Sequence, residues 1–122
     1  MKEIKIFSDV KYIKERSNPS IPIFLFSYKI KIKNNTNDKI QLLNRHWKIT
    51  DGNGNTNIVN GKGVIGLQPI ILKNEEFEYS SFCPIQTESG MMNGWYEMKN
   101  INGELFKIDI PMLSLFTPSS KN

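Results

Sequence analysis

Alternation of apolar and polar residues at every second position is the feature that most constrains the fold of this chain. It is clearest in the stretch FLFSYKIKIK at positions 24–33, where one parity is apolar and the other carries three lysines. The apolar members are Phe24, Phe26, Tyr28, Ile30 and Ile32. Successive side chains of a β-strand point to opposite faces, so the pattern predicts a strand with one buried and one solvated face.

Shorter alternating runs occupy positions 3–7, 77–83 and 105–110. Turn-forming Asn and Gly residues separate the runs at 34–38, 51–55 and 99–103, and we interpret these segments as tight hairpin turns. No segment of helical length carries a sustained helical apolar stripe, and we expect 87–94 (TESGMMNG) to be a loop. The spacing predicts an all-β sandwich of seven to eight antiparallel strands.

Length and composition indicate one globular domain, which we place at 1–116, followed by a flexible C-terminal tail at 117–122. No apolar run approaches the roughly 20 residues needed to span a bilayer, and the charged N-terminal stretch lacks the apolar segment of a secretory signal. Cys83 is the only cysteine, so an internal disulfide is excluded. We therefore expect a cytoplasmic protein without membrane attachment.

The net charge of +4 comes mostly from lysine, with Arg16 and Arg45 as the only arginines. Bidentate recognition of phosphates and guanines favours arginine, so this charge does not favour a nucleic-acid partner. Lys29, Lys31 and Lys33 share one strand face, and we interpret them as a solvated outer surface.

The segment GKGVIG at 61–66 fits the glycine pattern of dinucleotide-binding proteins. That chemistry requires a helix after the last glycine, whose N-terminus faces the pyrophosphate. Here Pro69 and another alternating strand follow the last glycine, so we reject the hypothesis of a dinucleotide-binding site. The glycines instead predict an irregular sheet edge or a crossover between sheets.

Backbone N–H groups in a glycine loop can bind an anion without a helix, so we retain a candidate anion site. Its members are Gly61, Lys62, Gly63, Gly66, Arg45 and His46. The following segment, Leu67, Gln68, Pro69 and Ile70, is interpreted either as core or as a partner-binding edge.

His46 is the only histidine and Cys83 the only thiol, but the pattern does not favour a catalytic pair. Cys83 shares a strand face with Phe77 and Tyr79, which indicates a small buried residue. No His, Cys or Asp spacing typical of a metal site is present, and we expect no metal, cofactor or catalytic residue.

Trp47 is predicted to pack between the sheets, as the strand-C tryptophan does in immunoglobulin domains. Arg45 has the same parity as Trp47, so we expect it on the same side of the strand. There it pairs with a carboxylate such as Asp51 or stacks on an aromatic ring, because a buried arginine needs a partner.

Two long motifs closely resemble the ApaG family: NRHWKITDGNG from position 44 and GKGVIGLQPIILKNEEFEYSSFCPIQTESGMMNGWYEM from position 61. The resemblance covers about Ile4 to Pro111, with departures at Asn44, Lys73-Asn74 and Glu88. It implies a fibronectin type III-like, immunoglobulin-like sandwich. It also implies links to cobalt resistance and magnesium efflux in bacteria, and protein-interaction roles in eukaryotic F-box and DNA polymerase delta-interacting proteins. It supplies no catalytic residues.

Two functions are consistent with these observations. The leading hypothesis is a non-enzymatic binding module, monomeric or weakly dimeric, that recognises a protein partner or a small anion. The alternative is a sensor or enzyme for a phosphate or pyrophosphate ligand at the 61–66 loop, with Arg45 and His46.

Overall fold

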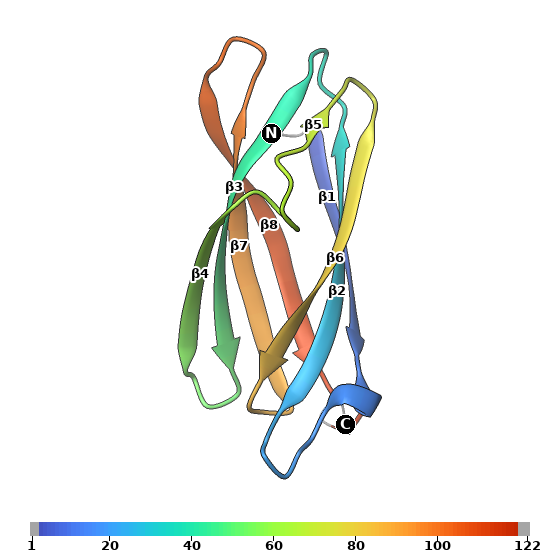
Figure 1. The fold of residues 1–122 in the computed structure, drawn as a ribbon, viewed down its shortest axis with the longest axis vertical. Coiled ribbons are helices and arrows are strands. Elements are labelled where there is room, and N and C mark those ends of the chain that lie inside the picture. Colours follow the sequence, from blue (N-terminus) through green and yellow to red (C-terminus); the bar gives the residue numbers. More distant parts are fainter. Residues whose placement is uncertain (1–2, 120–122) are drawn as a thin grey trace.

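The computed structural model describes residues 3–119, which fold into two packed antiparallel sheets (Figure 1). The strands are β1 (Ile4–Tyr12), β2 (Phe24–Asn34), β3 (Ile40–Asp51), β4 (Thr56–Lys62), β5 (Ile70–Ile71), β6 (Glu76–Ile85), β7 (Ser89–Lys99) and β8 (Leu105–Phe116). A short 3₁₀ turn, η1 (Lys14–Arg16), follows β1.

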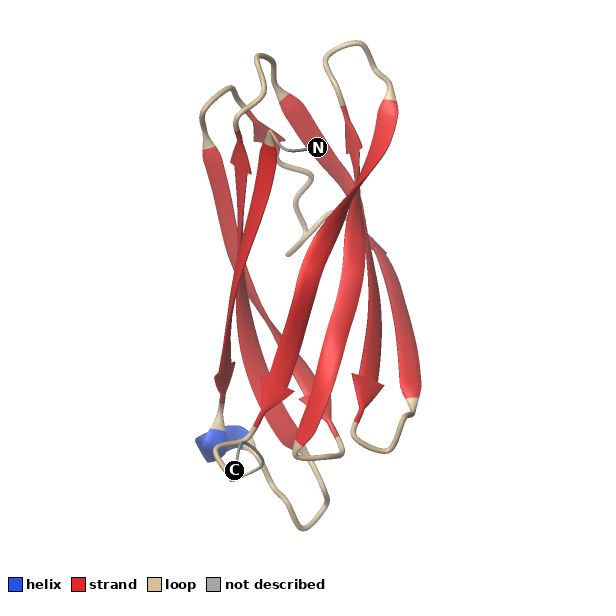
Figure 2. Ribbon diagram, turned by 180° about the vertical axis from the view of Figure 1, so that it is seen from behind, coloured by secondary structure: helices blue, strands red, loops and turns tan. Residues whose placement is uncertain are grey.

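The smaller sheet has the order β1-β2-β6, and the larger has the order β4-β3-β7-β8. Gln41 of β3 pairs with Ile70 of β5 on one side and with Lys99 of β7 on the other, so β5 continues the edge formed by β4. Figure 2 shows the two sheets face to face from behind. The predicted all-β sandwich of fibronectin type III and immunoglobulin type, with eight strands, is confirmed.

The apolar face of β2 forms the centre of the core. Phe24, Phe26, Tyr28, Ile30 and Ile32 are all buried, while Lys29 on the opposite face is exposed. The outer lysines lie beside acidic residues of β6, since Glu78 and Glu76 are the register partners of Lys31 and Lys33. Glu78 forms an ion pair of 3.5 Å with Lys29. The apolar and polar positions that alternate in the sequence are therefore the buried and outward-facing positions of β2.

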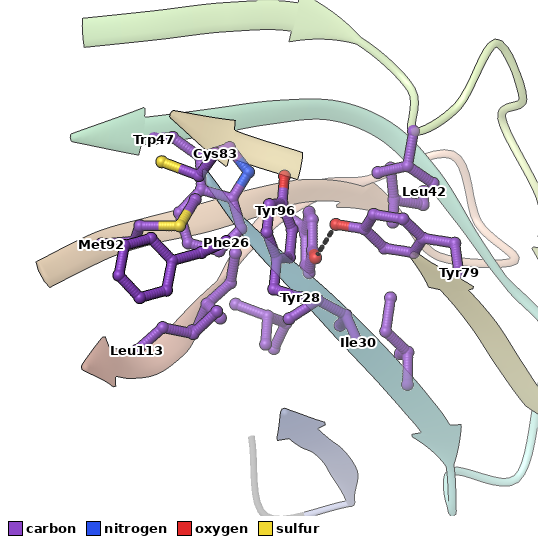
Figure 3. Close-up of a cluster of buried hydrophobic side chains, with 14 of the residues drawn as sticks. Phe26, Tyr28, Ile30, Leu42, Trp47, Tyr79, Cys83, Met92, Tyr96 and Leu113 are labelled. Atoms are coloured by element: carbon purple, nitrogen blue, oxygen red, sulfur yellow. Dashed lines mark hydrogen bonds between the residues drawn. The ribbon is translucent and has the colours of Figure 1, made fainter. Parts of the chain in front are cut away.

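Trp47 packs between the sheets, as predicted, with only 2% of its surface exposed. Its ring meets Tyr28 edge-on, with the ring centroids 5.6 Å apart (Figure 3). Within residues 3–119 the indole Nε1 has no hydrogen-bond partner, so we attribute the contribution of Trp47 to packing.

A pair of tyrosines links the two sheets inside the core. The hydroxyl groups of Tyr79 on β6 and Tyr96 on β7 are hydrogen-bonded to each other (Figure 3). Burial raises the pKa of both hydroxyls, so both stay neutral. Each hydroxyl thus has a partner in a region that excludes water.

The turns at 51–55 and 99–103 are hairpins, as predicted, but 34–38 is not. The first two join β3 to β4 and β7 to β8, whereas 34–38 carries the chain from the smaller sheet to the larger. Asn34 organises this connection, because its buried amide donates to the carbonyls of Asp38 and Ile71 and accepts from Thr36.

The loop expected at 87–94 is a correction, because β7 already begins at Ser89. Gly90 and Gly94 are strand residues that allow β7 to lie close against β3. A Cβ at Gly90 would crowd the carbonyl oxygen of Thr50, and one at Gly94 would collide with the carbonyl oxygen of His46. Close backbone approach, rather than a turn, explains these glycines.

The segment assigned to a flexible tail, 117–122, lies partly outside the described residues, which end at Ser119. Within the described part, Thr117 is buried and its amide donates to the carbonyl of Glu88.

Replacing Trp47 by alanine should lower the free energy of unfolding by about 3–5 kcal/mol, because it leaves a large cavity between the sheets. Urea unfolding followed by circular dichroism measures this. Trp95→Ala, which truncates a half-buried tryptophan on the outer face, should cost less. A loss well under about 1 kcal/mol for Trp47→Ala would contradict its place in the core.

Candidate functional site

The glycine segment forms an irregular connection along one edge of the larger sheet. Gly63 follows β4 directly and has a φ of +65°, where a side chain would collide with the carbonyl of Leu67. Val64 and Leu67 then exchange two backbone hydrogen bonds of 2.9 Å, which close a tight turn over Ile65 and Gly66. The glycines were predicted to form either an irregular sheet edge or a crossover between sheets, and the structure shows the irregular edge. The chain crosses to the smaller sheet later, between β5 and β6.

Arg45 fixes the start of this connection. Its guanidinium lies against Gly61, its register partner on β4, where a Cβ would overlap the guanidinium. Nη1 donates to the carbonyl oxygens of Gly63 at 2.9 Å and Lys62 at 3.3 Å. The suggested pairing with Asp51 is wrong, because the Asp51 carboxylate caps its own turn through the amides of Asn53 and Asn55.

The backbone amides of the connection are partly engaged. Those of Gly63, Val64 and Leu67 donate to carbonyl oxygens of the protein. Among the described residues, the amides of Ile65 and Gly66 have no such partner.

The six residues predicted for an anion site fall on two sides of the larger sheet. Arg45, Gly61 and Gly63 meet on the side that faces the core. His46 and Lys62 alternate with them and therefore lie on the outer face. Gly66 lies at the tip of the turn, and no atom of residues 3–119 lies within 4 Å of a Cβ built there. The structure thus brings Arg45 to the glycines but not His46.

His46 belongs to an aromatic stack on the outer face. Its ring lies parallel to Trp95 on β7, with centroids 4.8 Å apart, and its Nδ1 is hydrogen-bonded to the side chain of Asn60. The amine of Lys107 on β8 lies 4.1 Å from the centroid of Trp95. Trp95 was not predicted as part of a site, although its position next to Tyr96, which is buried, is a signal that places it on the outer face.

The predicted partner-binding segment, Leu67 to Ile70, divides into two kinds of residue. Gln68 and Pro69 hold the connection against β3: Gln68 donates to the carbonyl of Leu43 at 2.9 Å, and the Leu42 amide donates to Pro69 at 3.0 Å. Leu67 and Ile70 are exposed by 51% and 53%.

Two further apolar side chains of this connection, Ile65 and Leu72, are exposed to a similar extent. We call Ile65, Leu67, Ile70 and Leu72 the edge patch. Ile65 and Leu72 were not predicted as surface residues, because an irregular connection has no periodicity that indicates which side chains are exposed.

Cys83 lies in the core on β6 of the smaller sheet, whereas the His46 stack lies on the outer face of the larger sheet. Burial raises the pKa of its thiol to about 11, so it is a neutral thiol near pH 7. In residues 3–119, no three His, Cys, Asp or Glu side chains gather into a group that could hold a metal ion.

Residues 14–100 match the family model described as the ApaG domain. The chain belongs to the ApaG family. It is 43% identical to the Protein ApaG of Agrobacterium fabrum and 42% identical to that of Rhizobium etli. Each of these alignments covers 117 residues, which is 96% of this chain and 90% of the relative.

Solved structures agree with this membership of the ApaG family. A Bordetella pertussis protein described as ApaA is 36% identical, with a TM-score of 0.91 over 94% of each chain. A structural-genomics target solved by X-ray is 38% identical, with a TM-score of 0.90, over 96% of this chain and 89% of the other. In the described part of this ApaG chain, no helix is long and apolar enough to cross a membrane.

Gly63→Ala should destabilise the protein more than Gly66→Ala. Both glycines have positive φ and carry a comparable backbone cost, about 1–2 kcal/mol, when replaced by an L-residue. Only at Gly63 does the new methyl group also meet a backbone carbonyl, since the space around Gly66 is open. Urea unfolding of the two variants checks the order, and equal losses would contradict the close contact at Gly63.

Proposed function

We propose that this ApaG-family chain is a non-enzymatic binding module and that the edge patch contacts a protein partner. The observation that carries the proposal is the placement of four exposed apolar side chains along one short connection at the edge of the larger sheet. Apolar side chains that gather on a surface are typical of protein-interaction sites.

The backbone under the edge patch is held in place, which favours binding. Gln68, Gln41 and Pro69 tie the connection to β3 through three hydrogen bonds, and the Arg45 guanidinium fixes its first residues. A surface that is ordered before binding loses less conformational entropy when a partner docks.

The arrangement of reactive side chains supports the non-enzymatic part of the proposal. Cys83 is buried and protonated. His46 lies on the outer face of the other sheet, where it stacks on Trp95 and is hydrogen-bonded to Asn60. Nucleophilic catalysis needs the thiol and the imidazole within hydrogen-bond reach.

The resemblance of this chain to the ApaG family, whose bacterial members are linked to cobalt resistance and magnesium efflux, suggests an indirect role in cation homeostasis. We propose that the module acts on cation homeostasis through its partner and works in the cytoplasm. The single cysteine, which is buried and has no disulfide partner, fits a reducing compartment.

Leu67→Lys combined with Ile70→Lys should abolish partner binding without unfolding the protein, because both side chains are about half exposed. Tagged wild-type and variant proteins are expressed in the source organism, and cross-linked partners are identified by mass spectrometry. The partner is then purified and its affinity for each protein is measured by calorimetry.

The control replaces Ile21 and Met112, which lie elsewhere and are exposed by 63% and 52%, with lysine. It should bind like the wild type. Equal partner affinity of the Leu67/Ile70 variant and the wild type would contradict the proposal.

A small anion at the glycine connection is the second candidate, because the backbone amides of Ile65 and Gly66 donate to no group of the described part of the chain. Titration with pyrophosphate should then shift the NMR signals of these two amides, and Lys62→Ala should weaken the effect more than Lys48→Ala. Unchanged signals at millimolar pyrophosphate would remove this candidate.

A further inference from the structure

In residues 3–119, four strands longer than the two-residue β5 lie at the edges of the two sheets, and three of these four carry residues that discourage further strand pairing. Prolines and charged side chains at an edge oppose the addition of another strand. The protecting residues are Lys5, Asp9 and Lys11 on β1; Glu76, Glu78 and Pro84 on β6; and Lys107, Asp109 and Pro111 on β8. The β4 sequence, TNIVNGK, has no proline and no charge before its last residue, Lys62.

The hydrogen-bond register shows which groups of β4 are unpaired. The Asp51 amide donates to the carbonyl of Asn55, and the Gly63 amide donates to the carbonyl of Leu43. Hydrogen-bonded positions alternate in an antiparallel pair, so the odd-numbered residues from 55 to 63 face β3. The amides and carbonyls of Thr56, Ile58 and Asn60 therefore point away from the sheet. Figures 1 and 2 both place β4 at the outer margin of the molecule.

One end of this edge is already engaged. The carbonyl of Lys62 accepts a hydrogen bond from Arg45, which leaves Thr56 to Asn60 as the open stretch. Ile58 lies at its centre and is 50% exposed. Its side chain is the one apolar group that this stretch presents on the outer face, between Thr56 and Asn60.

We propose that the open edge of β4 pairs with β4 of a second copy of this chain, about a two-fold axis at Ile58. In this antiparallel register, Ile58 faces Ile58 of the other copy and Thr56 faces Asn60. Each pair brings together two residues whose amides and carbonyls both point outward, so their hydrogen bonds match. The two larger sheets become one continuous sheet with an isologous interface.

Charge is compatible with this symmetric arrangement. Lys62 falls opposite Gly54 of the other copy, outside the open stretch, so no like charges face each other directly. Lys48, the register partner of Ile58 on β3, is three strand spacings, roughly 14 Å, from its symmetry mate. Like charges at that distance are largely screened at physiological salt. Because the strand is its own complement in this register, a second copy is the occupant that the edge fits.

Sedimentation equilibrium of the full chain over a concentration series tests the dimer. The weight-average mass of the wild type should rise toward twice the mass of one chain as concentration increases. Ile58→Lys places a charge on the axis and should keep the protein monomeric over the same range. Ile101→Lys replaces an isoleucine of equal exposure, 52%, in the β7–β8 turn and should dimerise like the wild type.

A second measurement tests the axis itself. Ile58→Cys treated with a short bismaleimide should give a covalent dimer, whereas Ile101→Cys should not, and the buried Cys83 does not compete for the reagent. A wild type that stays monomeric at all concentrations overturns the proposal. So does an Ile58→Lys variant that associates as strongly as the wild type, which would place the interface elsewhere. Neither result bears on the edge patch, because Leu67 and Ile70 are unchanged in these variants.

Discussion

Burial of one face of β2 between the two sheets is the constraint on which the rest of the structure depends. Phe26, Ile30 and Ile32 have no exposed surface, and the strand touches neighbours on both sides within its own sheet. A one-residue slip would turn the lysines inward, so the register is strongly specified. With β2 fixed, Tyr28 sets the position of Trp47 in the opposite sheet, and Trp47 in turn fixes the side of β3 on which Arg45 lies.

The sequence was sufficient for the strands in which apolar and polar side chains alternate with period two. It predicted that the strand face carrying Phe24 to Ile32 is buried and that Trp47 and Cys83 lie in the core. Each of these predictions needs only the alternation within one strand. It did not predict which strands share a sheet. The segment 34–38 looked like a hairpin turn, and nothing local shows that Asn34 bonds to Ile71, 37 residues away. The β7 residues 89–94 were predicted to be a loop, and this too depends on a contact distant in sequence. Their glycines are needed because the backbone of β3 lies close to them.

The candidate site was predicted from the sequence less well than the strands. Arg45 and His46 were grouped with the glycines because they are close in sequence, yet adjacent residues of a strand face opposite sides. The guanidinium reaches the carbonyls of Lys62 and Gly63, while the imidazole stacks on Trp95. The edge patch could be anticipated only in part. Exposure in an irregular connection depends on hydrogen bonds such as that from Gln68 to Leu43, which no periodicity reveals.

The turn from Val64 to Leu67 places Ile65 at a φ of +44°. The left-handed region strongly disfavours β-branched residues, and glycine or asparagine would occupy the position with less strain. Burial compensates this strain only in part, since 55% of the surface of Ile65 is exposed. Local backbone preference and the side chain thus disagree at this one position, a case of local frustration in an otherwise consistent sandwich. The folded protein is therefore less stable than it would be with glycine or asparagine at position 65. In return, the turn carries an exposed apolar side chain at its tip.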